Sequence, residues 1–149
     1  MKKIKIDLKL VIIAGVILLT GLGFILNNKP VSDEEKYSFF IRNTKTASQG
    51  GEILLKEGTL FSINLEITGT SGYYWYYEWE GEALMILKEE ALFDLYKKER
   101  SDYMVGNLNK VWKWQAVKKG KAKLVYSYYR QWEGKESIIK KEVFEIQID

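Results

Sequence analysis

Histidine and cysteine are absent from all 149 residues of the chain. Without them the chain has no Ser-His-Asp or Cys-His catalytic group and no zinc site of the usual Cys/His type. Disulfides are excluded as well, so a folded domain must be stabilised by its hydrophobic core, which is feasible at this length. We therefore expect no metal ion and no cofactor, and we look for a function outside these classes of enzyme.

Carboxylates are the catalytic groups that remain, and Glu78, Glu80 and Glu82 alternate at the end of an aromatic stretch. Glycosidases use such a pair on the two sides of the scissile bond. Residues two apart on a strand only share one face, however, and for charged residues this is usually the face in water. Ser71 as a nucleophile needs a lysine base, and the sequence indicates no particular lysine for it. The interpretation is a protein that is not an enzyme and has no small-molecule substrate.

Charge is missing from residues 10–26, an apolar run that follows a basic segment at residues 1–9. A helix of about 17 residues spans roughly 25 Å, slightly less than the hydrocarbon core, and flanking lysines can make up the difference. The lysines favour a signal anchor with residues 1–9 in the cytoplasm. A cleaved signal peptide is the alternative, because Gly21 and Gly23 are small enough for a cleavage site. In both cases we expect the following domain outside the cell, held at the cell membrane or secreted.

Proline occurs once, at Pro30, in the polar segment 27–36, which we interpret as a linker. The predicted domain follows at residues 37–149. Residues 30–149 carry 18 Lys or Arg and 19 Asp or Glu, so this part has no overall positive charge to attract nucleic-acid phosphates. The lysine-rich segment 118–123 is interpreted as a solvated hairpin turn. We expect no nucleic-acid partner.

Apolar and polar residues alternate with a period of two over short segments of this domain, which is typical of strands. About seven short strands with turns between them favour an all-β, immunoglobulin-like Greek-key sandwich, preceded by the N-terminal hydrophobic helix. Residues 88–103 are less regular and predict a long connection or one helical turn. The predicted strands are 37–42, 52–55, 59–67, 83–87, 110–117, 121–130 and 142–149. The residues predicted to lie in the core are Phe61, Ile63, Leu65, Ile67, Trp75, Trp112, Trp114, Ala116, Ala122, Leu124, Tyr126, Tyr128, Phe144, Ile146 and Ile148.

Two connections contain residues that a plain turn does not require. The segment from Thr68 to Gly72 holds only glycine, threonine and serine, and an aromatic strand follows it. Small side chains let a backbone approach a partner closely, although they also suit an ordinary turn. Trp132 lies beyond the end of its strand and close to Arg130, and these residue types are enriched at interface hot spots. In a Greek-key sandwich of seven strands the two connections emerge at the same end.

These segments resemble two motifs of the chagasin family, exported inhibitors of papain-like cysteine proteases. The first family motif is N-P-T-T-G-x-x-W, and here it appears as T-G-T-S-G-Y-Y-W at residues 68–75, with Thr68-Gly69 in place of Asn-Pro. The third motif is R-P-W/F, and here it appears as Arg130-Gln131-Trp132. The second motif, G-x-G-G, corresponds to V-G-N-L-N at residues 105–109, where Gly106 matches. The resemblance covers roughly residues 48–149.

The resemblance implies a β-sandwich that blocks the active-site cleft of a papain-like cysteine protease without a covalent bond. In such inhibitors the first and second loops lie over the catalytic cysteine and the third flanks the cleft. The implied partners are this protease and, if the N-terminus is uncleaved, the membrane through residues 10–26. The residues that the resemblance assigns to protease binding are Thr68, Gly69, Thr70, Ser71, Gly72, Gly106, Asn107, Leu108, Asn109, Arg130, Gln131 and Trp132.

Two other functions stay open at the level of sequence. The first is an exported β-sandwich that binds carbohydrate or another protein, with Trp132 as a stacking platform and no inhibitory activity. The second is a purely structural extracellular domain.

Overall fold

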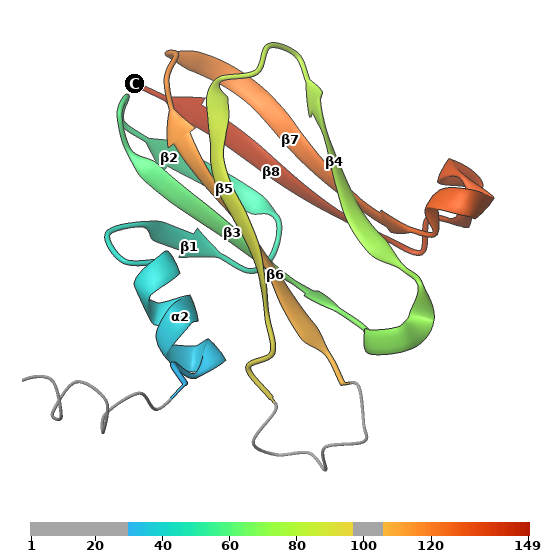
Figure 1. The fold of residues 1–149 in the computed structure, drawn as a ribbon. Coiled ribbons are helices and arrows are strands. Elements are labelled where there is room, and N and C mark those ends of the chain that lie inside the picture. Colours follow the sequence, from blue (N-terminus) through green and yellow to red (C-terminus); the bar gives the residue numbers. More distant parts are fainter. Residues whose placement is uncertain (1–29, 97–105) are drawn as a thin grey trace, which may run out of the picture. The chain divides into compact units, whose positions relative to one another are not determined.

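Two four-stranded sheets pack face to face in the computed structural model, which describes residues 30–96 and 106–149. Sheet A has the order β1-β3-β6-β5 and sheet B the order β2-β8-β7-β4 (Figure 1). All pairs are antiparallel except β1 with β3 and β2 with β8. The elements of the compact unit Ser32–Asp149 are α2 (Asp33–Phe40), β1 (Lys45–Ala47), β2 (Gly51–Leu55), β3 (Leu60–Ile67), β4 (Tyr74–Glu80), β5 (Met85–Phe93), β6 (Leu108–Ala116), β7 (Gly120–Tyr129) and β8 (Lys140–Ile148), with short 3-10 turns η1 (Gly69–Ser71), η3 (Gln131–Glu133) and η4 (Lys135–Ser137).

The chain order across the sheets gives the sandwich predicted from the sequence. The chain passes from sheet A to sheet B between β3 and β4, returns between β4 and β5, and crosses again between β6 and β7. Two hairpins, β5–β6 and β7–β8, complete the pattern. The all-β sandwich is therefore confirmed, with eight strands in the described residues where about seven were expected.

The core between the sheets consists of the side chains for which the alternation predicted inward faces. Of the predicted core residues, all are buried except Ala122, which is partly buried and packs against the others. Trp112, Trp114 and Tyr126 are the largest fully buried side chains. The Nε1 of Trp114 donates to the hydroxyl of Tyr126 at 3.0 Å, so the polar tips of both rings have a partner inside the core. Burial raises the pKa of Tyr126, which keeps this hydroxyl neutral.

Residues 37–42 were predicted as a strand, and this prediction is wrong, because residues up to Phe40 belong to helix α2. The helix begins with a capping box: the Ser32 hydroxyl accepts from the Glu35 amide at 3.2 Å, and the Glu35 carboxylate accepts from the Ser32 amide at 3.1 Å. This reciprocal pair satisfies two amides that have no partner within the helix. The helix therefore begins inside the segment interpreted as a linker.

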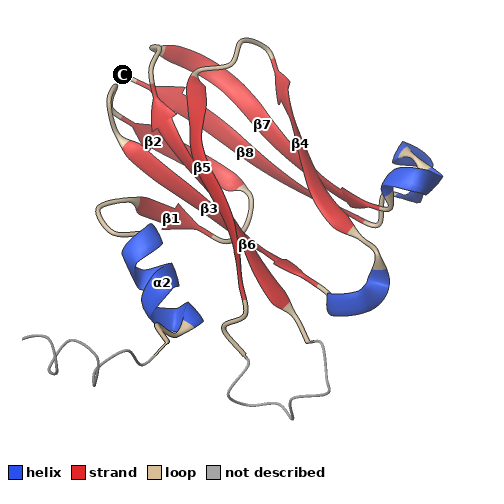
Figure 2. Ribbon diagram, in the orientation of Figure 1, coloured by secondary structure: helices blue, strands red, loops and turns tan. Residues whose placement is uncertain are grey.

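Helix α2 covers the outer face of sheet A (Figure 2). Phe40 packs with Phe93 and Val111 in a second, smaller hydrophobic cluster, and the Phe40 and Phe93 rings meet edge to face at 5.5 Å. The hydroxyl of Tyr37 accepts from the Asn64 side chain at 3.1 Å. Sheet A is thus buried on both faces near the helix, and strict alternation of apolar and polar residues fails there.

Strand β5 is longer than predicted and includes residues 88–93, for which the sequence indicated a connection or a helical turn. Its register against β6 shifts between Leu87 and Glu89. Such a bulge inserts one extra residue, Lys88, and breaks the period of two on which the prediction depended. Beyond the bulge, ion pairs join Glu89 to Lys113 and Glu90 to Lys110, both at 3.1 Å.

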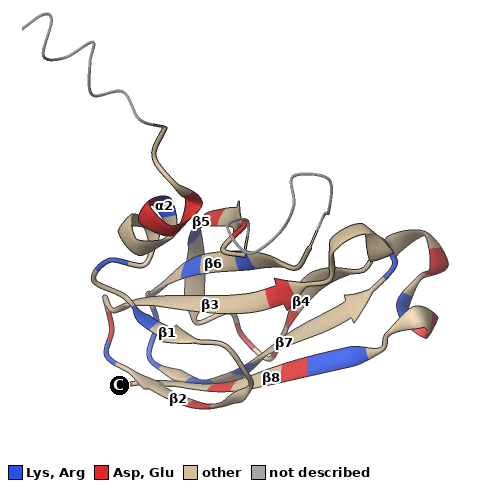
Figure 3. Cartoon of the chain, turned by 90° about the horizontal axis from the view of Figure 1, so that it is seen from below, with Lys and Arg blue, Asp and Glu red and all other residues tan. Residues whose placement is uncertain are grey.

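The apolar run 10–26 and the expected hydrophobic helix lie outside the described residues. Within residues 30–96 and 106–149, no helix has the length and apolar character to cross a membrane. Charges of both signs are distributed over the strands (Figure 3), and on β8 the basic Lys140 and Lys141 are followed directly by Glu142.

Candidate functional site

Three connections leave the sandwich at one end, and we call them loop 1, loop 2 and loop 3. Loop 1 (residues 68–73) joins β3 to β4, loop 2 (residues 94–107) joins β5 to β6, and loop 3 (residues 130–139) joins β7 to β8. Residues 97–105 of loop 2 lie outside the described residues. The short helical turns of loops 1 and 3 lie beyond the ends of β4 and β7 (Figure 2).

Strand pairing fixes this common end. Ile67, the last residue of β3, is paired with Leu108, the first residue of β6. Tyr74, the first residue of β4, is paired with Tyr129, the last residue of β7. Loop 1 therefore begins beside loop 2 and ends beside loop 3. The sequence prediction that the first and third motifs emerge at one end agrees with this register.

Loop 1 is a tight turn made by its own small residues. Its centre is η1, in which the Ser71 hydroxyl donates to the Thr68 carbonyl at 2.7 Å. Gly72 follows with a φ of 74°, in the left-handed region that favours glycine. Thr70 is exposed at the tip of the turn.

Aromatic side chains from the neighbouring strands hold the base of loop 1. The Thr68 amide donates to the Tyr128 hydroxyl at 2.9 Å, and Trp75 Nε1 donates to the Glu66 carbonyl at 2.8 Å. The Trp75 bond joins β4 of sheet B to β3 of sheet A, and the Tyr128 bond joins β7 of sheet B to the residue directly after β3. The Trp75 and Tyr128 rings pack at 4.8 Å. The rings thus support the base of loop 1.

Loop 3 is built from η3 and η4 and presents Trp132. Ser137 closes the loop, because its hydroxyl accepts from the Arg130 amide at 3.2 Å and donates to the Gly134 carbonyl at 2.8 Å. Trp132 is 70% exposed and has the largest exposed fraction among the large hydrophobic residues of the described part. Gln131, the first residue of η3, is exposed beside it.

Loops 1 and 3 touch each other through side chains from loop 3. The Trp132 ring lies against Gly72 so closely that a Cβ atom at residue 72 would lie 2.3 Å from the ring atom Cη2. Arg130 Nε donates to the Ser71 carbonyl at 3.1 Å. The Arg130 guanidinium also lies 4.5 Å from the centre of the Tyr73 ring. A hydrogen bond to the Glu133 carboxylate raises the pKa of Arg130.

The residues proposed for loop 2 separate into an exposed and a buried group. Asn107 is exposed, and its side chain donates to the Glu66 carboxylate at the end of β3. Gly106 is half-buried beside it. Leu108 and Asn109 are the first residues of β6, and the Asn109 side chain is buried. Its Nδ2 has no hydrogen-bond partner among the described residues. The structure therefore brings Asn107 to the loop end and keeps Asn109 within the sheet.

Four residues near the loops were not predicted as site residues: Tyr73, Tyr128, Glu133 and Ser137. Each contacts a predicted residue across a turn or between strands. Tyr73 occupies a variable position inside the first motif, directly after Gly72, so its place next to the loop was visible in the sequence. The other three were not, because their contacts depend on the packing of the two sheets and on the turns η3 and η4.

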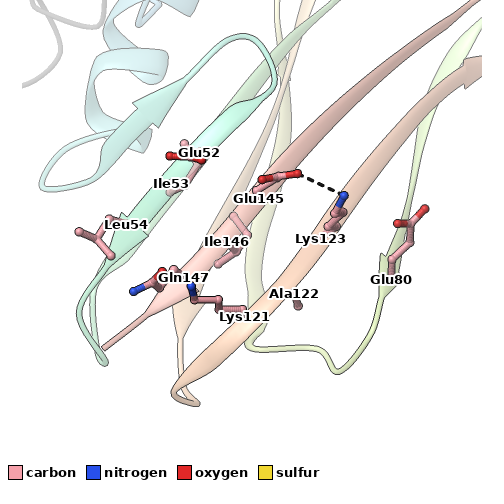
Figure 4. A pocket seen from close by; sticks show the side chains of 10 residues that line it. All are labelled: Glu52, Ile53, Leu54, Glu80, Lys121, Ala122, Lys123, Glu145, Ile146 and Gln147. Atoms are coloured by element: carbon pink, nitrogen blue, oxygen red, sulfur yellow. Dashed lines mark ion pairs between the residues drawn. The ribbon is translucent and has the colours of Figure 1, made fainter.

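A depression lined by residues of β2, β7 and β8 lies at the opposite end of sheet B from the loops, and its lining is drawn in Figure 4. It has a volume of about 710 Å³ and is crossed by an ion pair between Lys123 and Glu145 at 3.2 Å. A smaller groove of about 390 Å³ runs between the edges of β4 and β5, and Ile67, Tyr74 and Leu92 are part of its lining. Among the described residues, no group of three or more metal-ligating side chains is assembled.

A cysteine protease inhibitor is among the solved structures that align with this chain. The inhibitor EhICP2 from Entamoeba histolytica aligns with a TM-score of 0.60 at 16% identity, over 71% of this chain and 96% of that chain. Amebosin aligns with a TM-score of 0.50 at 17% identity, over 71% and 96%. PbICP-C, solved in complex with falcipain-2, aligns with a TM-score of 0.48 at 17% identity, over 70% and 92%. No relative was found among curated protein sequences.

The structures are at most 17% identical to this chain and show a similar fold, whereas a family model identifies the family. The model of the chagasin family of peptidase inhibitors (I42) matches residues 54–148, which is more than half of the chain and includes all three loops. The match begins within β2 and leaves out α2 and β1. The chain therefore belongs to the chagasin family of peptidase inhibitors.

Proposed function

We propose that the protein inhibits papain-like cysteine proteases by placing loops 1, 2 and 3 in the active-site cleft without forming a covalent bond. The observation that carries this proposal is the contact between loop 1 and loop 3, where the exposed Trp132 lies against Gly72. The two loops form one pre-assembled edge of the kind that a cleft can receive. Family membership supports the inhibitory function.

The small residues of loop 1 suit a narrow cleft. Thr70 is exposed at the tip, and Gly69, Ser71 and Gly72 add little bulk around it. Hydrogen bonds from Thr68 and Ser71 fix the turn before any partner binds. A rigid loop loses less conformational entropy on binding. It also resists the extended conformation in which a protease cuts its substrates.

Trp132 supplies the apolar area for the interface. An exposed tryptophan indole gives up little by leaving water, and tryptophan is among the residues most enriched at binding hot spots. Asn107 offers an amide at the same end of the sandwich. In the proposed complex, loop 1 and Asn107 lie over the catalytic cysteine and Trp132 packs beside the cleft.

Single substitutions test this arrangement. Thr70→Ala and Trp132→Ala should each raise the inhibition constant for papain by about tenfold or more, as expected for truncated hot-spot residues. Leu54→Ala is the matched control, because Leu54 is 61% exposed but lies at the opposite end of the sandwich. Denaturant unfolding of all three variants should match the wild type. Equal inhibition by all variants would contradict the placement of the loops in the cleft.

A carbohydrate-binding module is the second candidate, because the exposed Trp132 ring is also a suitable stacking surface for a sugar. A glycan array separates the two functions. Glycan binding that Trp132→Ala abolishes, with no inhibition of any papain-like protease by the wild type, would favour this candidate.

We further infer from residues 1–26 that the domain acts outside the cell, either anchored in the membrane or secreted. Protease protection of the domain in intact cells, with and without permeabilisation, tests this location.

A further inference from the structure

Building on the proposed function, we infer that Arg130 is a positioning residue that holds loop 1 in its binding conformation, and that it does not itself contact the protease. The sequence motif suggests the opposite role, a cation offered to the partner. The contacts of the side chain within this chain carry the inference.

The Arg130 guanidinium already has partners on several sides. Its Nε donates to the Ser71 carbonyl at 3.1 Å, and its Nη1 forms an ion pair with the Glu133 carboxylate at 2.9 Å. Its Cζ lies 4.5 Å from the centre of the Tyr73 ring, which is within the range of a cation–π interaction. The charge is thus balanced by Glu133 and the planar group lies next to Tyr73 before any protease binds.

The backbone of Arg130 is fixed as well. The Ser137 hydroxyl accepts from the Arg130 amide and donates to the Gly134 carbonyl, so both ends of η3 are tied together. The guanidinium therefore projects from a fixed base. An arginine held in this way donates to its neighbours in a fixed geometry. Its side chain has little conformational freedom left to form a contact with the protease.

Arg130 donates to the Ser71 carbonyl, which lies at the point where the backbone of loop 1 leaves its helical turn. Ser71 is the last residue of η1, and Gly72 after it has the conformational freedom of glycine. A turn of glycine and small polar residues has many alternative conformations. Arg130 fixes the carbonyl of Ser71, and Trp132 covers Gly72 from the same loop. Loop 3 thereby fixes the C-terminal half of loop 1, while Tyr128 fixes its start.

Lysine is a poor replacement for Arg130 under this inference. An ammonium group keeps the positive charge, but it lacks the planar fork that reaches Ser71 and Glu133 together and lies next to Tyr73. A contact that depends on charge alone would be largely preserved by lysine. Arg130→Lys and Arg130→Gln therefore separate a positioning residue from a direct cationic contact.

The first arm of the test measures papain inhibition by the full-length chain and its variants at several salt concentrations. Arg130→Lys and Arg130→Gln should both weaken inhibition by about tenfold, mainly through faster dissociation, with the salt dependence of association unchanged. Combined with Thr70→Ala, each should give a non-additive loss. The matched control is Lys123→Gln, which removes an exposed cation that pairs with Glu145 at the opposite end of sheet B and should leave inhibition unchanged. Full activity of Arg130→Lys together with a reduced salt dependence for Arg130→Gln would overturn the inference.

The second arm needs no protease, so it distinguishes failure of this inference from failure of the proposed function. In ¹⁵N relaxation of the free protein, the amides of Thr70 and Gly72 should show increased mobility in Arg130→Lys, while amides of β6 stay unchanged. If these amides are as ordered in the variant as in the wild type, Arg130 does not position loop 1. If the wild type fails to inhibit any papain-like protease but this mobility appears, only the proposed function is wrong.

Discussion

Gly69 and Gly72 lie three residues apart in loop 1 and have different structural requirements. Gly72 has a φ of 74° and no room for a Cβ, whereas Gly69 begins η1 and is not among the glycines with positive φ. Only Gly72 therefore needs to be glycine. The family motif agrees, since it keeps glycine at the position of Gly72 and has proline at the position of Gly69.

Gly72→Ala should reduce both stability and inhibition. The left-handed conformation costs a residue with a Cβ roughly 1–2 kcal/mol, and the new methyl group must displace the Trp132 ring. We expect unfolding at lower denaturant concentration and an inhibition constant at least as weak as that of Trp132→Ala. Gly69→Ala is the matched control and should behave like the wild type. Equal effects of the two substitutions would contradict the described geometry.

Gly69→Pro should stabilise the protein. Proline suits the first position of a helical turn, and Thr68 before it already has the extended conformation, with φ of −75° and ψ of 109°, that a residue preceding proline prefers. Removing the freedom of glycine from the unfolded chain should add about 0.4–1 kcal/mol to the free energy of unfolding. Chemical denaturation measures this gain. A loss of stability would show that the Gly69 amide or its φ is required.

At the scale of elements, the regular strands were predictable and the irregular ones were not. β3, β6, β7 and β8 were predictable because apolar residues recur with a period of two on the face that packs in the core. Helix α2 was missed because aromatic residues in 37–42 suggested a strand, although Ser32 and Glu35 form a capping box three residues apart. β5 was cut short because the extra residue at Lys88 reverses the alternation.

The same distinction applies to the candidate site. The motif residues of loops 1 and 3 could be predicted, because they lie between strongly patterned strands. The hydrogen bond from Arg130 to Ser71 could not, since it joins residues 59 positions apart and depends on where η3 places the side chain. Asn109 is buried although it shares a face of β6 with Val111, outside the main core, and the sequence pattern did not reveal this.

Phe40→Ala should destabilise the domain without changing the loops. Phe40 is buried between α2 and sheet A, and replacing a buried phenylalanine by alanine costs about 3–5 kcal/mol. Urea unfolding monitored by tryptophan fluorescence measures this loss. Under conditions where the variant is folded, its inhibition constant should equal that of the wild type. The control is Phe39→Ala, because Phe39 is 69% exposed on the same helix. An equal cost for both substitutions would show that α2 does not pack as described.

At the scale of the whole molecule, the absence of histidine affects pH dependence. Histidine is the side chain whose ordinary pKa lies in the neutral range, so the stability of the domain should be nearly constant between about pH 6 and 8. Below that range carboxylates matter: a hydrogen bond from Lys135 lowers the pKa of Glu78. A pKa that is lower in the folded state contributes stability above the unfolded value, and this contribution is lost as the pH falls through the folded value.

Denaturation midpoints measured from pH 3 to 8 test this prediction. The midpoint should be flat above pH 6 and should fall in acid, and Glu78→Gln should remove a small part of the acid-dependent fall because the pair is exposed. A transition centred near pH 6.5 would contradict the account, since no side chain in this sequence is expected to titrate there.

The central claim is that this chain blocks the cleft of papain-like proteases, and a stoichiometric titration tests it most directly. Residues 30–149, which include the whole capped helix α2, are added to papain of known active-site concentration, and residual activity is followed with a fluorogenic peptide. Activity should fall linearly to zero at one inhibitor per active enzyme and return on dissociation, because no covalent bond forms. Undiminished activity of papain and of a cathepsin-like enzyme at micromolar inhibitor would contradict the claim.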